Sequence, residues 1–137
     1  MRSRTALGLA VALLATACET KPIEPPTQAL APPSAELPAA YARFHGVWSG
    51  KWDETWDVTF VIDEVSGAGV AAGHYYWKEH VPGPWHHQTT FGRISSDAVT
   101  FGVMTITIDP ADDTKAVAVG RFERNTRTAS LTKLQGP

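Results

Sequence analysis

The chain has 137 residues, with 12 Lys or Arg against 14 Asp or Glu, a formal net charge of −2 and one cysteine. This length is enough for one small domain, and the scattered charges lack the basic patch of a nucleic-acid-binding protein. One cysteine cannot form a disulfide within the chain, so we expect packing alone to hold the fold together.

Residues 1–17 have the layout of a signal peptide. Arg2 and Arg4 precede an apolar run over residues 6–15, and small residues follow. The run is shorter than the roughly 20 residues that a membrane-spanning helix needs. We therefore predict a signal peptide that is removed on export.

The only cysteine, Cys18, directly follows this segment. Residues 13–18, LLATAC, resemble a bacterial lipobox. The resemblance implies that Cys18 becomes the first residue of a mature lipoprotein and carries acyl chains such as palmitate. More than one chain gives stable anchoring. Glu19 in the next position implies sorting to the periplasmic face of the outer membrane. An ordinary secreted protein with a chance cysteine is the alternative.

Residues 18–40 are predicted to be a disordered tether between the lipid and a domain over residues 41–137. Six of the ten prolines lie in this stretch, and it has no aromatic residue. Such a segment buries too little apolar surface to offset the entropy lost on ordering.

Residues 44–53, FHGVWSGKWD, are predicted to form the first strand and not a helix. Gly46 and Gly50 inside a helix would each cost about 1 kcal/mol relative to alanine. In a strand the two glycines share a face with Trp48 and Trp52 and leave room for the indole rings.

The segments that follow alternate between apolar and polar residues, which is the period of a strand. In residues 56–63, for example, Trp56, Val58 and Phe60 fall on one face. Clusters of Gly, Pro, Asp, Asn and Ser separate the segments at short intervals, and no segment has a convincing helical period. The further predicted strands are residues 56–63, 70–78, 86–94, 98–109 (bent or divided at Gly102), 115–123 and 127–134.

Seven or eight short strands joined in sequence predict an all-β antiparallel meander. Closing such a sheet into a small barrel removes both of its exposed edges. We predict the barrel, with a sandwich as the alternative.

The pattern Phe44-x-Gly46-x-Trp48 resembles the first-strand motif of the calycins, the lipocalin-like barrels. The resemblance implies that Trp48 is a structural plug at the closed end of the barrel. It also implies that a basic residue from a late strand packs across the Trp48 ring, and such a contact contributes about 0.5–2 kcal/mol. The candidates for this residue are Arg121, Arg127 and Lys133.

Residues 73–87, GHYYWKEHVPGPWHH, have the most unusual local composition. Amphipathic aromatic side chains near the mouth of a barrel are suited to stacking on a sugar or an apolar molecule. The predicted ligand-binding residues are Tyr76, Trp77, Trp85, His86 and His87.

The same histidines raise the possibility of zinc, which accepts imidazole nitrogens. His80, His86 and His87 would be the ligands, with His74 or Glu79. However, no His-x-His or His-Glu-x-x-His spacing is present, and adjacent histidines on a strand point to opposite faces. We predict no metal and no cofactor.

No catalytic constellation is evident, because the domain has neither a cysteine nucleophile nor a Gly-x-Ser-x-Gly sequence. We expect a non-enzymatic binding or accessory role in the periplasm. The partner would be a small apolar or saccharide ligand or an envelope protein, with the membrane reached only through the lipid on Cys18. The alternatives are a structural or protein-interaction module, such as an inhibitor of a wall-degrading enzyme, and a metal-dependent hydrolase.

Overall fold

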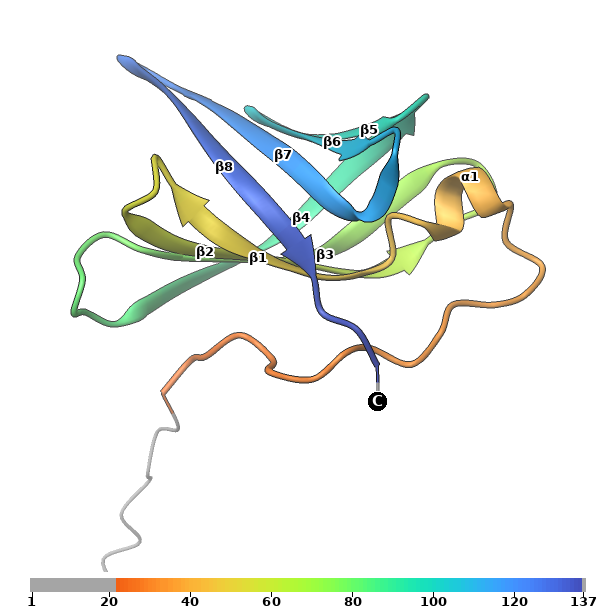
Figure 1. Cartoon of the computed structure of the whole chain (residues 1–137), viewed down its shortest axis with the longest axis horizontal. Coiled ribbons are helices and arrows are strands. Elements are labelled where there is room, and N and C mark those ends of the chain that lie inside the picture. Colours follow the sequence, from red (N-terminus) through yellow and green to blue (C-terminus); the bar gives the residue numbers. More distant parts are fainter. Residues whose placement is uncertain (1–21, 137) are drawn as a thin grey trace, which may run out of the picture.

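The computed structural model describes residues 22–136, so the predicted signal peptide and Cys18 lie outside the described residues. Within this range the chain forms one closed antiparallel barrel, in which strands adjacent in sequence are adjacent in the sheet (Figure 1). This confirms the all-β meander barrel. Its strands are β1 (Gly46–Trp52), β2 (Trp56–Val65), β3 (Val70–Lys78), β4 (Trp85–Ser95), β5 (Ala98–Phe101), β6 (Met104–Asp109), β7 (Asp112–Phe122) and β8 (Asn125–Lys133).

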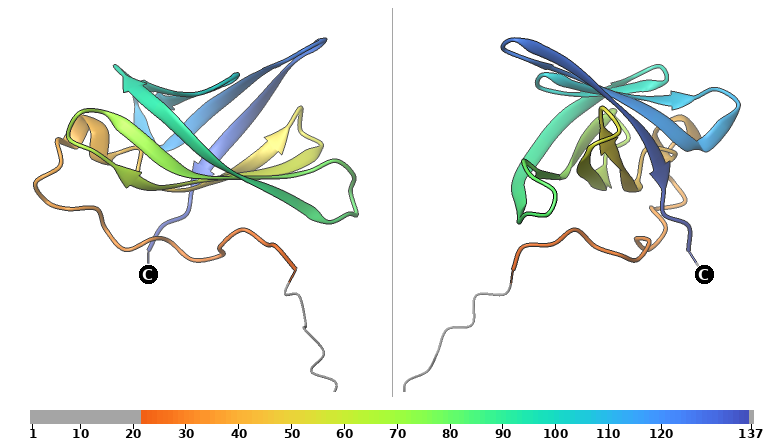
Figure 2. Two further views of the ribbon diagram at one scale, coloured as in Figure 1. Left: turned by 180° about the vertical axis from the view of Figure 1, so that it is seen from behind. Right: turned by 60° about the vertical axis from the view of Figure 1, so that its left-hand side comes forward.

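The barrel closes because β1 pairs with strands from both ends of the domain. On one side Trp48 is paired with Phe60 of β2, and on the other side it is paired with Lys133 of β8. Figure 2 shows the curved sheet from two other directions. Each strand therefore has a neighbour on both sides, although β4 pairs with β5 only from Arg93 to Ser95.

Two tight turns explain where the first and middle strands end. After Trp52, both Asp53 (φ 49°) and Glu54 (φ 60°) are left-handed, and the chain reverses so that Trp56 pairs with Trp52. Gly102 (φ 56°) is left-handed as well, and it divides the long predicted strand over residues 98–109 into β5 and β6.

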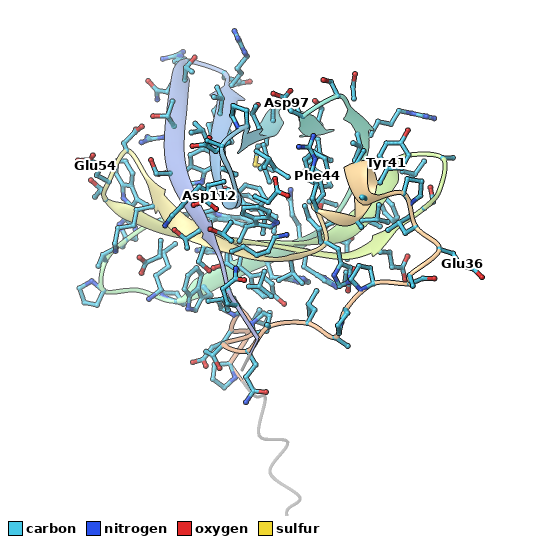
Figure 3. The ribbon with its side chains drawn as sticks, turned by 45° about the vertical axis from the view of Figure 1, so that its right-hand side comes forward. Glu36, Tyr41, Phe44, Glu54, Asp97 and Asp112 are labelled. Carbon is cyan, nitrogen blue, oxygen red and sulfur yellow. The ribbon has the colours of Figure 1, made fainter. Side chains whose placement is uncertain are left out.

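Alternate residues of each strand fill the interior. The largest fully buried side chains are those of Trp48, Phe44, Phe60, Ile62, Ile106, Ile108 and Leu131. Phe44 enters the barrel directly after α1 (Ala39–Ala42), a single helical turn that the sequence pattern does not predict (Figure 3).

The outer face of β1 and β2 carries an unusual buried strip. Val47 and Val61 are paired across these strands and are 0% and 4% exposed, yet neither belongs to the interior core cluster. Residues 22–38, which form no helix or strand, run along this side of the barrel (Figures 1 and 2). We call residues 22–38 the strap. The disorder predicted for residues 18–40 stays a prediction.

The strap borders two grooves on the outside of the barrel. Pro25, Pro26 and Thr27 face Trp85 and Leu134 across one groove. Pro33, Ser34, Glu36 and Leu37 border the other, together with residues of β2 and β3 and with Phe91 of β4. Between residues 22 and 136 there is no helix with the length and apolar character needed to cross a membrane.

Candidate functional site

Trp48 occupies the end of the barrel where the chain enters and leaves it. Its side chain is fully buried, and its indole Nε1 donates a hydrogen bond to the backbone oxygen of Phe44 at 3.0 Å. Lys133 Nζ lies 4.7 Å from the centre of the Trp48 ring and donates a hydrogen bond to the backbone oxygen of Arg43. Of the three basic residues considered for this contact, Lys133 is the one that makes it. Trp48 and the side chains around it therefore fill this end of the barrel.

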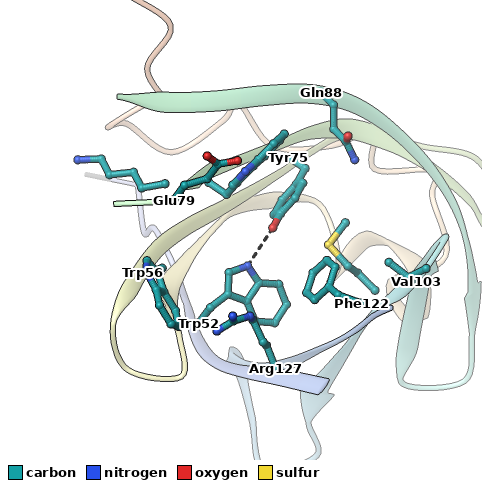
Figure 4. Close-up of a pocket in the computed structure, with 11 residues that line it drawn as sticks. Trp52, Trp56, Tyr75, Glu79, Gln88, Val103, Phe122 and Arg127 are labelled. Atoms are coloured by element: carbon teal, nitrogen blue, oxygen red, sulfur yellow. Dashed lines mark hydrogen bonds between the residues drawn. The ribbon is translucent and has the colours of Figure 1, made fainter. Parts of the chain in front are cut away.

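The opposite end of the barrel holds a cavity of about 450 Å³. Figure 4 shows how side chains from several strands surround it. Its volume lies within the range of pockets that bind small molecules. The lining residues are Trp52, Trp56, Tyr75, Trp77, Lys78, Glu79, Gln88, Val103, Met104, Phe122 and Arg127.

Tyr75 and Trp77 line one wall of this cavity and belong to a ladder of stacked rings. Tyr75 lies between Phe60 and Trp77, with ring centres 5.0 Å and 4.8 Å away, and His86 stacks on Trp77 at 5.4 Å. The ladder exists because alternate residues of β3 point inward and because the register pairs Trp77 with His86 of β4. Stacking of this kind holds each ring in a fixed plane.

One hydrogen bond ties the floor of the cavity to this wall. Trp52 Nε1 donates to the hydroxyl oxygen of Tyr75 at 2.9 Å (Figure 4). Burial raises the pKa of Tyr75 to about 12, while the hydrogen bond from Trp52 acts in the opposite direction. The hydroxyl is therefore a neutral O–H group over the whole physiological pH range.

The basic side chains at the mouth of the cavity make cation–π contacts and ion pairs with other side chains. The Arg127 guanidinium lies 4.2 Å from the centre of the Trp56 ring and is 3.0 Å from the Asp53 carboxylate. Lys78 Nζ lies 4.9 Å from the centre of the Trp85 ring and 3.8 Å from Asp57. The site can therefore hold a flat apolar molecule, but it offers no unpaired cluster of one charge.

The five predicted ligand-binding residues fall on two faces of the sheet. Trp77 lines the cavity, and His86 stacks on Trp77 without lining the cavity itself. Tyr76, Trp85 and His87 alternate with these residues and lie on the outer face of the barrel.

His87 takes part in a polar cluster on the outer face. His74 Nδ1 and His87 Nε2 are 2.9 Å apart, and His74 Nε2 is 3.4 Å from the Asp63 carboxylate. The two ring centres are 5.1 Å apart, so the facing nitrogens lie close to the line that joins the rings. This geometry suits one shared N–H···N hydrogen bond and not two lone pairs directed at one ion. Within residues 22–136 no three His, Cys, Asp or Glu side chains are grouped so that they could hold a metal ion.

Several cavity residues were not among the predicted ones: Trp52, Trp56, Tyr75, Phe122 and Arg127. The alternation of side chains along a strand could have identified Tyr75 as a cavity residue, because Tyr75 points to the same face as Trp77. Strand parity does not identify Trp52 as a cavity residue. It predicts that Trp48 and Trp52 both point into the barrel, but it does not predict which end of the barrel is open. Cys18, the predicted lipidation site, lies outside the described residues.

The chain was compared with models of protein families, with curated proteins and with solved structures, and none of them matches it.

Proposed function

We propose that this protein is a lipocalin-like envelope lipoprotein that binds a small, mainly apolar molecule in the open end of its barrel and does not catalyse a reaction. The observation that carries this proposal is the cavity of about 450 Å³, which is walled by five aromatic side chains and closed off from the other end by the Trp48 plug. Mostly apolar walls with a few polar groups are typical of small-molecule sites.

The balance of polar and apolar groups favours an apolar ligand over a saccharide. A sugar carries a hydroxyl on nearly every carbon, and each hydroxyl loses free energy if it is buried without a partner. The lining offers the Tyr75 hydroxyl, the Gln88 amide and charged groups at its mouth. These groups are too few for a buried sugar ring, whereas the stacked rings and Met104 suit a flat hydrocarbon framework.

The sequence supports an envelope location. Residues 1–17 have the layout of a signal peptide, and Cys18 stands where a lipobox cysteine would be acylated. We propose attachment at Cys18 to the periplasmic face of the outer membrane. The calycin-like motif around Trp48 and the eight-stranded closed barrel agree with a lipocalin-like protein.

A role in binding another envelope protein is the second candidate. Phe91, on the outer face of β4, is 74% exposed and borders a groove that also includes Leu37 and Val70. Exposed apolar side chains beside a groove are common at protein interfaces. Phe91→Ser would then reduce photo-crosslinking from position 70 to a neighbouring protein in intact envelopes, whereas a role confined to the cavity predicts no change.

The test of the cavity is a fluorescence titration of the tag-free soluble chain, residues 19–137, with the neutral dye N-phenyl-1-naphthylamine. We expect saturable binding of one dye molecule per chain. Trp77→Ala should weaken the affinity by about tenfold, since it removes apolar contact area from the cavity wall. Trp85→Ala is the matched control, because it removes an indole of the same size from the outer face. Absence of saturable binding, or equal weakening by both variants, would contradict the proposed site.

A further inference from the structure

The hydroxyl of Tyr75 has a donor function that the protein itself does not use. Its oxygen accepts the Trp52 Nε1–H at 2.9 Å, but its own proton has no acceptor among residues 22–136. A tyrosine hydroxyl can donate one hydrogen bond while it accepts another. Tyr75 and Trp52 both line the cavity, so an acceptor brought in by a ligand can take this proton.

Two sets of contacts fix the position of the Tyr75 hydroxyl. The Tyr75 ring is held between Phe60 and Trp77, and the Trp52 N–H restricts how the hydroxyl can be oriented. Tyr75 is only 6% exposed, so water competes weakly for the proton once a ligand fills the cavity. A preorganised donor in an apolar wall discriminates between ligands that do and do not carry an acceptor.

The mouth of the cavity selects against a charged ligand. The Arg127 guanidinium is paired with the Asp53 carboxylate, and the Lys78 ammonium lies over the Trp85 ring on the outer face, so neither is directed at a carboxylate in the cavity. Glu79, which also lines the cavity, adds a negative group that repels an anion, and its nearest basic neighbour is His86 at 3.8 Å. A neutral acceptor oxygen is therefore favoured over a carboxylate or a phosphate.

We propose that the ligands of this cavity are neutral, mainly apolar molecules with one acceptor oxygen, such as a ketone, ester or ether, and that Tyr75 is the residue that selects for this oxygen. The proposal rests on the proposed function, because it concerns the same cavity. The oxygen enters first and lies at the hydroxyl of Tyr75, and the hydrocarbon framework lies against the ring of Trp77.

The test compares two ligands that share one framework, benzophenone and diphenylmethane, which differ in a carbonyl against a methylene group. Both are titrated by displacement of N-phenyl-1-naphthylamine from the wild-type chain and from Tyr75→Phe. Desolvation of the carbonyl is common to both proteins, so the change in the ratio of the two dissociation constants measures the loss of the Tyr75 donor, less any donation to the carbonyl from the Trp52 N–H that the substitution frees. We expect Tyr75→Phe to weaken benzophenone by about 3- to 10-fold and to leave diphenylmethane unchanged.

Tyr41→Phe is the matched control, because it removes a hydroxyl near the β2–β3 turn at the far end of the barrel. It should alter neither affinity. Equal weakening of both ligands by Tyr75→Phe would show that Tyr75 acts through packing, and it would overturn the inference while leaving the proposed function intact. Failure of the dye and of both ligands to bind the wild type would overturn the proposed function itself.

A measurement on the wild type keeps the inference testable if Tyr75→Phe does not fold. When a hydroxyl donates a hydrogen bond, its oxygen becomes a better acceptor, because hydrogen bonds in a chain polarise one another. Benzophenone should therefore move the indole N–H proton resonance of Trp52 downfield, and diphenylmethane should not. Equal shifts with the two ligands would contradict a hydrogen bond from Tyr75.

Discussion

Two tryptophans on the same face of β1, Trp48 and Trp52, are four residues apart and have different partners. Trp48 donates its indole N–H to a backbone oxygen and lies under Lys133, which closes one end of the barrel. Trp52 donates its indole N–H to Tyr75 and lines the cavity at the other end. Each buried N–H has an acceptor, as the cost of an unsatisfied donor requires. Both indoles belong to the packed core, and Trp52 also lines the cavity.

The raised pKa of Tyr75 predicts a loss of stability in alkali. Its pKa is about 12 in the folded chain against an ordinary 10.0. Because the folded pKa is the higher one, the contribution is fully present below pH 10.0 and is lost as the pH rises toward about 12. The loss should be on the order of 2 to 3 kcal/mol.

The measurement is urea unfolding of the wild type and of Tyr75→Phe at about pH 9 and about pH 11.5. Every other ionisable group is common to both proteins, so its effect cancels in the difference. Tyr41→Phe serves as the control and should behave like the wild type. If Tyr75→Phe loses as much stability as the wild type between the two pH values, Tyr75 does not titrate as the structure implies.

At the scale of elements, the strap is the feature that distinguishes this barrel from a bare meander. Val47 and Val61 point away from the interior and are nonetheless buried, on the side where residues 22–38 run. Two apolar side chains in this position would otherwise form an exposed patch across β1 and β2. We therefore infer that the strap covers these two side chains of the first hairpin.

Removal of the strap should destabilise the barrel. A chain that begins at residue 39 exposes part of Val47 and Val61, and we expect a loss of about 1–3 kcal/mol in the free energy of unfolding relative to residues 22–137. A chain that begins at residue 25 is the control, because Pro22, Ile23 and Glu24 are exposed. Equal stability of all three chains in urea would show that the strap does not cover this strip in solution.

The sequence pattern predicted the strands well because burial on one side of a sheet imposes a period of two. Parity also separates Trp77, which points inward, from Tyr76, which points outward. It does not reveal the cavity, since that depends on which end of the closed barrel is filled by large side chains. Nor does it reveal the strap, whose contacts join residues that are distant in sequence and have no period.

The whole molecule has a closed end and an open end. Trp48, Phe44 and α1 belong to the closed end, where β1 begins and β8 ends. The cavity lies at the end with the β1–β2 turn and the β3–β4 connection. A barrel of this kind presents one of its two ends to a ligand.

The predicted lipid anchor is tested on the full-length protein in its native envelope. Cys18→Ala should abolish labelling with a radioactive or clickable palmitate and release the protein from the membrane fraction, because no acyl chain remains to hold it. Thr20→Ala changes a nearby residue and should keep both properties. Membrane fractionation of Cys18→Ala that is indistinguishable from the wild type would rule out anchoring through this cysteine.

The pairing of β1 with β8 also has a consequence for folding. Until Asn125–Lys133 has docked, the sheet is open and both β1 and β7 present unpaired backbone groups, which can pair with other chains. Closure joins segments about 80 residues apart, and contacts of such sequence separation slow folding. Early termination of translation or proteolysis within β8 would therefore leave an open, aggregation-prone sheet instead of a slightly smaller barrel.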